Sequence, residues 1–390
     1  MAEHPGEVTL DPRIIRRFQW ASTLNGLAFG LEISALPIYF QGLHLPPALY
    51  GLLVGLAWLV SLVVRVPIGT LALRFGNRPL MNAGAWAYAP LSWALLISGN
   101  VPLFFLIRLF NGVARSLMVL PLRSWFTELC PRPRLAHELG RLNAGFAVGQ
   151  SLIGGFGGPL LLSALGPVGL LGILGALPLV IWWLLRPAPP DHPAASARAA
   201  AGTATPLLLW VAAPCGLAAN SALTANAAFF PQLVQQLGWP TLAVGGLLFI
   251  QGAAAVWLAW HNGPIVGRWG EAAPAVAGHC FVLTAAGLLY LAPLGPVLPL
   301  VAALCGAASG TLPVLAMGLA ARSLSSRSQG ISVHETYISL GLGAGPFLGG
   351  LAIQALGTPR AALLAGAVFA VAGIVTALWQ RETLQPALSH

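Results

Sequence analysis

Long apolar runs occupy most of this 390-residue chain, and we count twelve of them. Each has about 20 residues, the length at which an α-helix crosses the hydrocarbon core of a bilayer. Since backbone polar groups in lipid must be satisfied within the protein, the pattern predicts an all-α membrane protein with twelve transmembrane helices. The runs begin near Phe18, Leu49, Pro79, Pro102, Leu139 and Pro167, and then near Pro206, Thr241, Ala273, Val297, Ile331 and Pro359.

Composition excludes several other classes of protein. With 57% hydrophobic and 7% charged residues, the chain has too little polar surface for a soluble globule of its length. The net charge of +9 comes from arginines that stand singly between apolar runs, so no nucleic-acid partner is expected. The four cysteines lack metal-ligand spacing, and no nucleotide-binding loop, His-Glu-x-x-His or Gly-x-Ser-x-Gly pattern occurs. We therefore expect no metal, no cofactor and no enzymatic activity.

A repeated loop divides the chain into two halves. Five identities recur at one interval of 194 residues, which predicts two pseudo-symmetric six-helix bundles. The pairs are Pro37 with Pro231, Gly51 with Gly245, Gly69 with Gly263, Arg74 with Arg268, and Gly76 with Gly270. We assign residues 18–186 and 206–381 to the bundles, 187–205 to a linker, and 1–17 and 382–390 to tails.

Arginine distribution predicts the orientation, because basic residues in short loops are retained on the cytoplasmic side. With the amino terminus inside, 15 arginines lie on the cytoplasmic side and only Arg360 lies outside. The inner set is Arg13, Arg16, Arg17, Arg74, Arg78, Arg123, Arg132, Arg134, Arg141, Arg186, Arg198, Arg268, Arg322, Arg327 and Arg381. The sequence thus predicts a multi-pass protein of the cell's inner (plasma) membrane with both termini in the cytoplasm.

The repeated loop resembles the signature between the second and third helices of the major facilitator superfamily. Gly69, Arg74, Gly76 and Arg78 match that signature, whereas Leu73 stands where the family has an acid. The resemblance implies gating roles for these loop residues and for Gly263, Arg268 and Gly270 in the second copy.

Two further patterns carry the resemblance. The fourth span holds Arg108, Asn111 and Gly112, similar to an Arg-x-x-x-Gly element that the family associates with proton coupling. A glycine motif of drug and proton antiporters begins at Gly154, Gly158 and Pro159 but stops short, with Leu162 and Ser163 in place of its last glycines. The complete motif occurs 187 residues later, at Gly341, Gly345 and Pro346. Small residues spaced by four also let helices approach closely, so a purely packing role is the alternative.

The resemblance implies a monomeric secondary transporter that moves a small molecule by alternating access. Its closest motifs imply proton-coupled export of an amphipathic or drug-like compound. An importer or uniporter of a small metabolite on the same fold is the alternative.

Glu32 is the main candidate for proton coupling, because it is the only acid deep in a predicted span. A charge at the bilayer centre costs about 2.5 to 3.5 kcal/mol on insertion scales, so its presence suggests function. Counting helical rise puts Arg108 at a similar depth, where the two could pair; a static ion pair is the alternative. The candidates for the substrate cavity are Asn25, Trp58, Arg115, Asn220, Asn226 and Gln251.

Three charged residues have competing interpretations. Arg115 could anchor substrate or serve as a structural partner. Arg65, near the inner end of the second span, is expected to extend to the membrane interface. Glu335 opens the eleventh span and is expected to cap its amino end, where the helix dipole favours negative charge.

Overall fold

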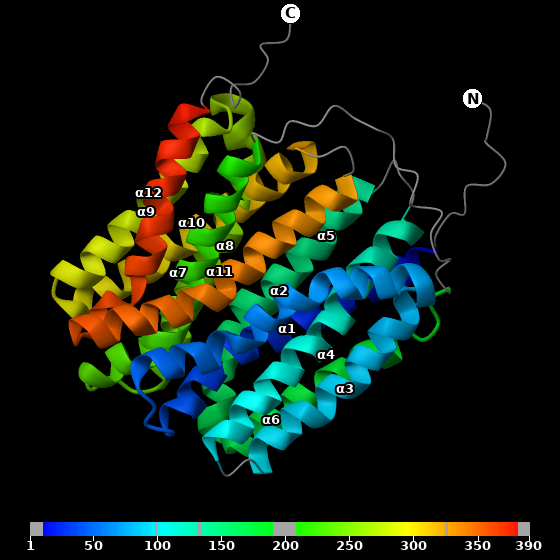
Figure 1. Ribbon diagram of the computed structural model, residues 1–390, viewed down its shortest axis with the longest axis horizontal. Helices are drawn as coiled ribbons and strands as arrows, with labels where there is room; N and C mark the ends of the chain where they lie inside the picture. The colour runs from blue at the N-terminus through cyan, green and yellow to red at the C-terminus, as the bar shows by residue number, and fades with distance from the viewer. Residues whose placement is uncertain (1–10, 98–99, 131–134, 190–207, 324–326, 381–390) are drawn as a thin grey trace, which may run out of the picture.

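A computed structural model describes residues 11–97, 100–130, 135–189, 208–323 and 327–380, and these residues form an all-helical protein (Figure 1). The predicted linker 187–205 and the tails 1–17 and 382–390 lie largely outside the described residues.

The first half contains α1 to α6 in chain order. Its fifth span is continuous through three segments: α5, a π-helical stretch η2, and the beginning of α6. Gly166, with φ 65° and ψ −173°, turns the chain inside α6 and separates the fifth span from the sixth. The bounds are α1 Pro12–Gln41, α2 Pro47–Phe75, α3 Asn77–Ile97, α4 Val101–Leu129, α5 Leu135–Ala147, η2 Val148–Gly154 and α6 Gly155–Leu185.

The second half repeats this order with α7 to α12. A short 3-10 segment, η4, precedes the last helix. The bounds are α7 Leu209–Gln236, α8 Leu242–Trp269, α9 Ala272–Leu291, α10 Leu294–Ser323, α11 Arg327–Leu356, η4 Pro359–Leu363 and α12 Leu364–Trp379. The twelve predicted helices are therefore confirmed, although α1 starts at Pro12, where the Asp11 side chain caps it by accepting from the Arg13 amide.

Eight stretches of the described residues are long and apolar enough to cross a membrane, and one of them, Gly140–Leu185, contains both the fifth and the sixth span. The central helices α1 and α7 are not among the eight. Both are buried along much of their length, and they pack against other helices rather than presenting a broad apolar face. Their polar composition is therefore compatible with an interior position in the bundle.

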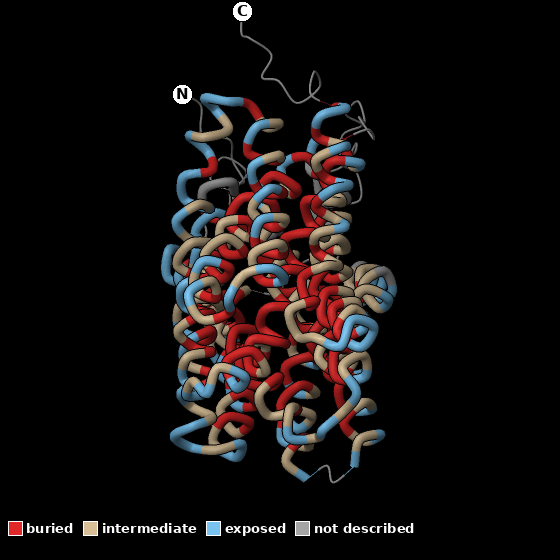
Figure 2. The backbone as a smooth tube through the Cα atoms, turned by 90° about the vertical axis from the view of Figure 1, so that its left-hand side faces the viewer, coloured by how far each residue is buried: buried red, intermediate tan, exposed pale blue. Residues whose placement is uncertain are grey.

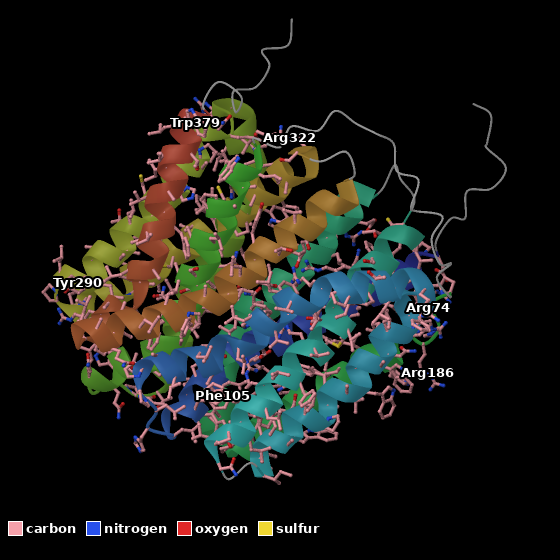
Figure 3. The ribbon with its side chains drawn as sticks, viewed as in Figure 1. Arg74, Phe105, Arg186, Tyr290, Arg322 and Trp379 are labelled. Carbon is pink, nitrogen blue, oxygen red and sulfur yellow. The ribbon has the colours of Figure 1, made fainter. Side chains whose placement is uncertain are left out.

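The two halves lie side by side, with α2 and α11 packed against each other where they meet (Figure 1). Buried residues concentrate inside this arrangement and exposed ones on its outer faces (Figure 2). Arg74, Arg186, Arg322 and Trp379 lie along one edge of the molecule, while Phe105 and Tyr290 lie toward the opposite one (Figure 3). We call the first edge the arginine end and the second the far end.

Backbone conformation explains why the loop glycines repeat. Gly76 has φ 86° and ψ 163°, and Gly270 has φ 72° and ψ −177°; both end a helix. A side chain disfavours this region of φ, so each helix can end in this way only at glycine. At the far end, His44 and Gly238 also share positive φ, at 51° and 66°, and they too are 194 residues apart.

The glycine motifs of the fifth and eleventh spans pair differently from their sequence match. The sequence aligns Gly154 with Gly341, but Gly154 packs on Leu27 and Gly30 of α1, whereas Gly345 packs on Ser221 and Thr224 of α7. The α1 and α7 contacts are equivalent in the 194-residue register, so Gly345 is the structural counterpart of Gly154. The interval between these spans is thus 191 residues, and the 187-residue match is wrong by about one helical turn.

Candidate functional site

A cavity of about 770 Å³ lies between the two halves. One wall comes from α1, α2, α4, α5 and η2, and the other from α7, α8, α10 and α11. The cavity opens at the arginine end, where Arg141, near the start of α5, lines it with a side chain that is 54% exposed.

Contacts between the halves close the far end. The Gln41 side-chain amide donates to that of Gln235 at 2.8 Å; Gln41 is the last residue of α1, Gln235 is the last but one of α7, and the two are 194 positions apart. The Tyr50 hydroxyl of α2 lies 2.9 Å from the Pro37 carbonyl of α1 and 2.7 Å from the Ala228 carbonyl of α7. The pseudo-symmetry axis of the protein therefore passes through this closure.

Glycines allow α2 and α11 to touch along the same region. A Cβ at Gly51 would overlap the Pro346 carbonyl oxygen, and one at Gly55 would overlap that of Gly343. Such backbone contact is possible only where both helices present small residues. The predicted packing residue Pro346 and its neighbourhood thus contribute to closing the far end.

Directly behind the cavity wall, the carboxylate of Glu32 is held by two arginines of α4. Arg108 binds one carboxylate oxygen and Arg115 the other. The Tyr88 hydroxyl of α3 donates to the same carboxylate at 3.1 Å, and Glu32 and Arg108 are each 2% exposed. The contact between Glu32 and Arg108 that helix depth suggested is therefore present, with Arg115 and Tyr88 as additional partners.

Arg115 differs from Arg108 in facing the cavity. Its guanidinium lies 3.9 Å from the ring centroid of Trp58 and 4.7 Å from that of Phe29, and all three residues line the cavity. Arg108 instead lies behind the wall and donates to the Val54 carbonyl at 3.1 Å. The seven-residue spacing puts both guanidiniums within reach of one carboxylate while giving only one of them access to a ligand.

A second cluster of charges crosses between the halves nearer the arginine end. Glu335 of α11 binds Arg65 of α2 at 3.3 Å and also Arg123 of α4. Because α11 begins at Arg327, Glu335 lies two turns inside the helix and does not cap it. Arg65 does not extend to the interface; its side chain is 13% exposed and faces the cavity. Both sequence-based interpretations were therefore wrong.

The remaining cavity candidates divide into two groups. Asn25, Asn220 and Gln251 line the cavity, although Asn220 uses its amide to donate to the Gly216 carbonyl at 2.8 Å. Asn226 does not line it and lies behind Gln251, to which it donates at 3.2 Å. The 194-residue counterparts Glu32 and Asn226 are thus both buried and both bonded to a neighbouring helix.

The predicted gating residues lie at the arginine end and outside the cavity lining. Arg74 and Arg268 are exposed, and no atom would lie within 4 Å of a Cβ at Gly69 or Gly263. Arg78 donates to the Arg186 carbonyl at 2.9 Å, which ties α3 to the end of α6. A gating role for these residues stays a prediction.

Sequence reasoning missed three parts of the site. Nothing in the sequence marked Tyr88 as a partner of Glu32, and Arg123 was used only to predict the orientation in the membrane. The π-helical η2 also lines the cavity, through residues that include Gln150 and Ser151. Short π-helical stretches inside α-helices are frequent at functional sites. The run of glycine and small residues around η2 was the available signal.

Two similar six-helix halves around a cavity open at one end define a multi-pass membrane protein with an alternating-access architecture. The chain belongs to the Major Facilitator Superfamily, whose profile matches residues 20–324 and 212–389. The superfamily consists of transporters rather than enzymes, in agreement with the sequence-based expectation.

Two relatives are similar to part of the chain. An uncharacterized MFS-type transporter of Methanocaldococcus jannaschii is 26% identical over 166 residues, which are 42% of each chain. The quinolone resistance protein NorA of Staphylococcus aureus is 26% identical over 134 residues, 33% of this chain and 34% of NorA. The chain therefore spans less than half the length of the relatives it matches.

Solved structures show the same fold over nearly the whole chain. A bacterial homolog of the human lysosomal transporter Spinster, inward-facing and unoccupied, has a TM-score of 0.74 and 17% identity, covering 98% of this chain and all of the other. A mutant of the nucleoside transporter NupG has a TM-score of 0.72 and 13% identity, covering 95% and 100%.

Proposed function

We propose that this protein is a secondary transporter that exports a small amphipathic or drug-like molecule in exchange for protons. The observation that carries the proposal is the Glu32 carboxylate, buried between Arg108 and Arg115 directly behind the wall of a cavity that is open on one side. The similarity to NorA supports export as the direction. The cavity is complete within one chain, which supports action as a monomer.

Alternating access on this fold requires the halves to part at the far end and to approach at the arginine end. The contacts at Gln41, Tyr50 and Gly51 hold the far end closed in the conformation seen here. The pair between Arg123 and Glu335 already joins α4 and α11 across the halves at the arginine end. We propose that this second contact is extended when the cavity opens to the far end.

Protonation of Glu32 would provide the coupling. A neutral carboxyl group no longer neutralises the two arginines, so Arg115 loses its ionic partner inside the cavity wall. The charge directly behind the cavity wall then rises by one, and the packing of Arg115 on Trp58 and Phe29 changes with it. A proton and a substrate would in this way influence each other's binding through one side chain.

Reconstitution in liposomes tests this function. We expect the purified protein to accumulate a fluorescent quinolone, an amphipathic drug with a carboxylate, when a pH gradient is applied, and only to equilibrate it without one. Proton movement, followed with an internal pH dye, should run opposite to the drug. Accumulation that is independent of the pH gradient would contradict proton coupling.

A specific observation also favours the second candidate, an importer on the same fold. Release of Arg115 on protonation of Glu32 would offer a cation to an anionic substrate, so proton and substrate would bind together and move in one direction. The absence of an acid at Leu73 in the signature loop also departs from the family's pattern. In the liposome assay, protons and substrate that move in the same direction would identify this second function.

We further propose that the arginine end faces the cytoplasm of a cell whose inner (plasma) membrane holds the protein, which makes the present conformation open to the inside. Arg74, Arg186 and Arg322 lie at this end (Figure 3), and Arg268 is three residues from Glu271, which pairs with Arg322; basic residues of cytoplasmic loops are distributed in this way. We expect a reporter enzyme fused after His390, or inserted within 187–205, to be active only in the cytoplasm. Activity of an alkaline phosphatase fusion outside the membrane at either place would contradict this orientation.

A further inference from the structure

Three polar groups in the cavity lining have no hydrogen-bond partner among the described residues. They are Nη1 of Arg65, Nδ1 of His334 and Oγ of Ser339. His334 is 4% exposed and Ser339 is fully buried. Buried polar groups are nearly always satisfied, and an unsatisfied one costs about 1 to 3 kcal/mol. Three together in one cavity indicate a place where a ligand completes the hydrogen bonding.

The three groups lie on two facing helices, within about one and a half helical turns of one another. The helices α2 and α11 run in opposite directions and touch at Leu59 and Gly343, and Arg65 meets Glu335 further toward the arginine end. His334 adjoins Glu335 in sequence. Ser339 lies four residues after Glu335, which is one helical turn along the same face. A ligand group bound beside Arg65 would therefore find His334 and Ser339 on the facing helix.

Charge in the cavity favours an anion. Four arginines and one glutamate line it: Arg65, Arg115, Arg123, Arg141 and Glu335. Two more carboxylates lie directly behind the lining, since Glu32 pairs with Arg115 and Glu138 lies 3.7 Å from Arg141. Because Glu32 and Glu335 are each held by two arginines, neither carboxylate is free to bind a cationic ligand.

The wall of the second half has a different character. From α8 and α10 it presents apolar residues, including Leu248, Ala255, Val256, Pro313, Val314 and Met317. All six belong to the second half, whereas the four arginines of the lining belong to the first half. A molecule with an anionic group and an apolar body would be matched on both sides, whereas a fully polar anion would lose its own hydration against the apolar second wall without compensation.

We infer that the cavity binds an amphipathic organic anion, with its carboxylate on Arg65, His334 and Ser339 and its apolar body on α8 and α10. This inference rests on the proposed function in one respect: it takes the molecule that binds in the cavity to be the molecule that is transported. Charge-assisted hydrogen bonds to a carboxylate are stronger than neutral ones, and a guanidinium can form two of them. Arg65 keeps Nη2 on Glu335 and has Nη1 available for the ligand.

Calorimetric titration of the full chain in detergent tests the inference with three ring-matched probes: 1-naphthoate, 1-naphthamide and 1-naphthylmethylammonium. We expect 1-naphthoate to bind about tenfold more tightly than the neutral amide, the gain typical of a hydrogen bond to a charged group, and the cation to bind most weakly. Equal affinity for the three probes, or no binding of 1-naphthoate, would overturn the inference.

Two variants locate the anion. Ser339→Ala removes a hydroxyl that has no partner among the described residues, so we expect no loss of a hydrogen bond within the fold and a several-fold weaker binding of 1-naphthoate alone. Arg65→Gln should abolish the preference for 1-naphthoate over 1-naphthamide. The matched controls are Ser92→Ala, a buried serine of α3, and Arg322→Gln, an arginine paired with Glu271, both outside the cavity. Neither control should change the preference.

Wild-type preference for 1-naphthoate in both Ser339→Ala and Arg65→Gln would place the anion elsewhere and overturn the assignment. If Arg65→Gln is not monodisperse by size-exclusion chromatography, Ser339→Ala decides alone. Since binding is measured without a pH gradient, the result is independent of whether Glu32 couples transport to protons.

Discussion

Substitution of Glu32 by Gln is expected to abolish substrate accumulation driven by a pH gradient while leaving substrate exchange without a gradient. Glutamine keeps the shape of a protonated carboxyl group but neither gains nor loses a proton. Arg108 and Arg115 would then always face a neutral side chain, as they do in the wild type only when Glu32 is protonated. The measurement is paired flux in liposomes, with and without the gradient. Accumulation at the wild-type level would remove Glu32 from the coupling mechanism.

Stability has to be separated from coupling in this experiment. Removing one partner of a buried ion pair costs about 3 to 5 kcal/mol, because the other charge stays buried without compensation. Glu32→Gln leaves the buried charges of both Arg108 and Arg115 without their carboxylate partner, so we also predict a lower melting temperature and reduced expression. The double variant Glu32→Gln with Arg108→Gln keeps the local charge at that of the wild type. It should recover a normal melting temperature but not pH-driven accumulation.

A bulky residue at Gly51 is expected to prevent closure of the far end. The backbone of α11 lies against this position, so a leucine side chain would overlap the Pro346 carbonyl. Overpacking a tight contact costs about 1 to 3 kcal/mol, enough to shift an equilibrium between two conformations by about 5- to 150-fold. Gly51→Leu should therefore favour the conformation open at the far end and should lower transport by about tenfold or more.

Labelling from outside the cell measures this shift. We expect Gln41→Cys, in a Cys280→Ser background, to react faster with an impermeant maleimide when Gly51→Leu is present. Cys280 is replaced because it is the exposed cysteine among the four, which are all described. Gly246→Leu is the matched control, since no atom would lie within 4 Å of a Cβ there. Unchanged labelling and transport in Gly51→Leu would show that this contact does not control the far end.

Some parts of the site could be predicted from the sequence, because their positions restrict which residue types can occur there. Glu32 was found from its depth alone, since an acid inside an apolar run is costly. The repeated Gly76 and Gly270 were found from identity and are explained by a conformation that side chains disfavour. Arg108 was matched to Glu32 by helical rise, because depth along a helix follows from residue number.

Other parts could not be read, and the reason is the same in each case. Glu335 was interpreted as a helix cap and Arg65 as an interface residue, yet they bind each other across the two halves. The two residues are 270 positions apart, and nothing local to either one indicates the other. The glycine motifs were aligned one turn away from their structural partners, because periodic small residues match equally well at several registers.

By itself, the sequence determined the all-helical membrane class, the twelve spans and the division into two related halves. These follow from apolar length, from repeated identities and from the need to satisfy the backbone in lipid. Only the tertiary structure decided that Arg115 rather than Arg108 faces the cavity, that Glu335 joins the halves, and that Asn226 lies behind Gln251. Which side chains face the cavity depends on the rotation of each helix about its own axis. That rotation is set by close packing against helices distant in the chain, for which a single sequence contains no local signal.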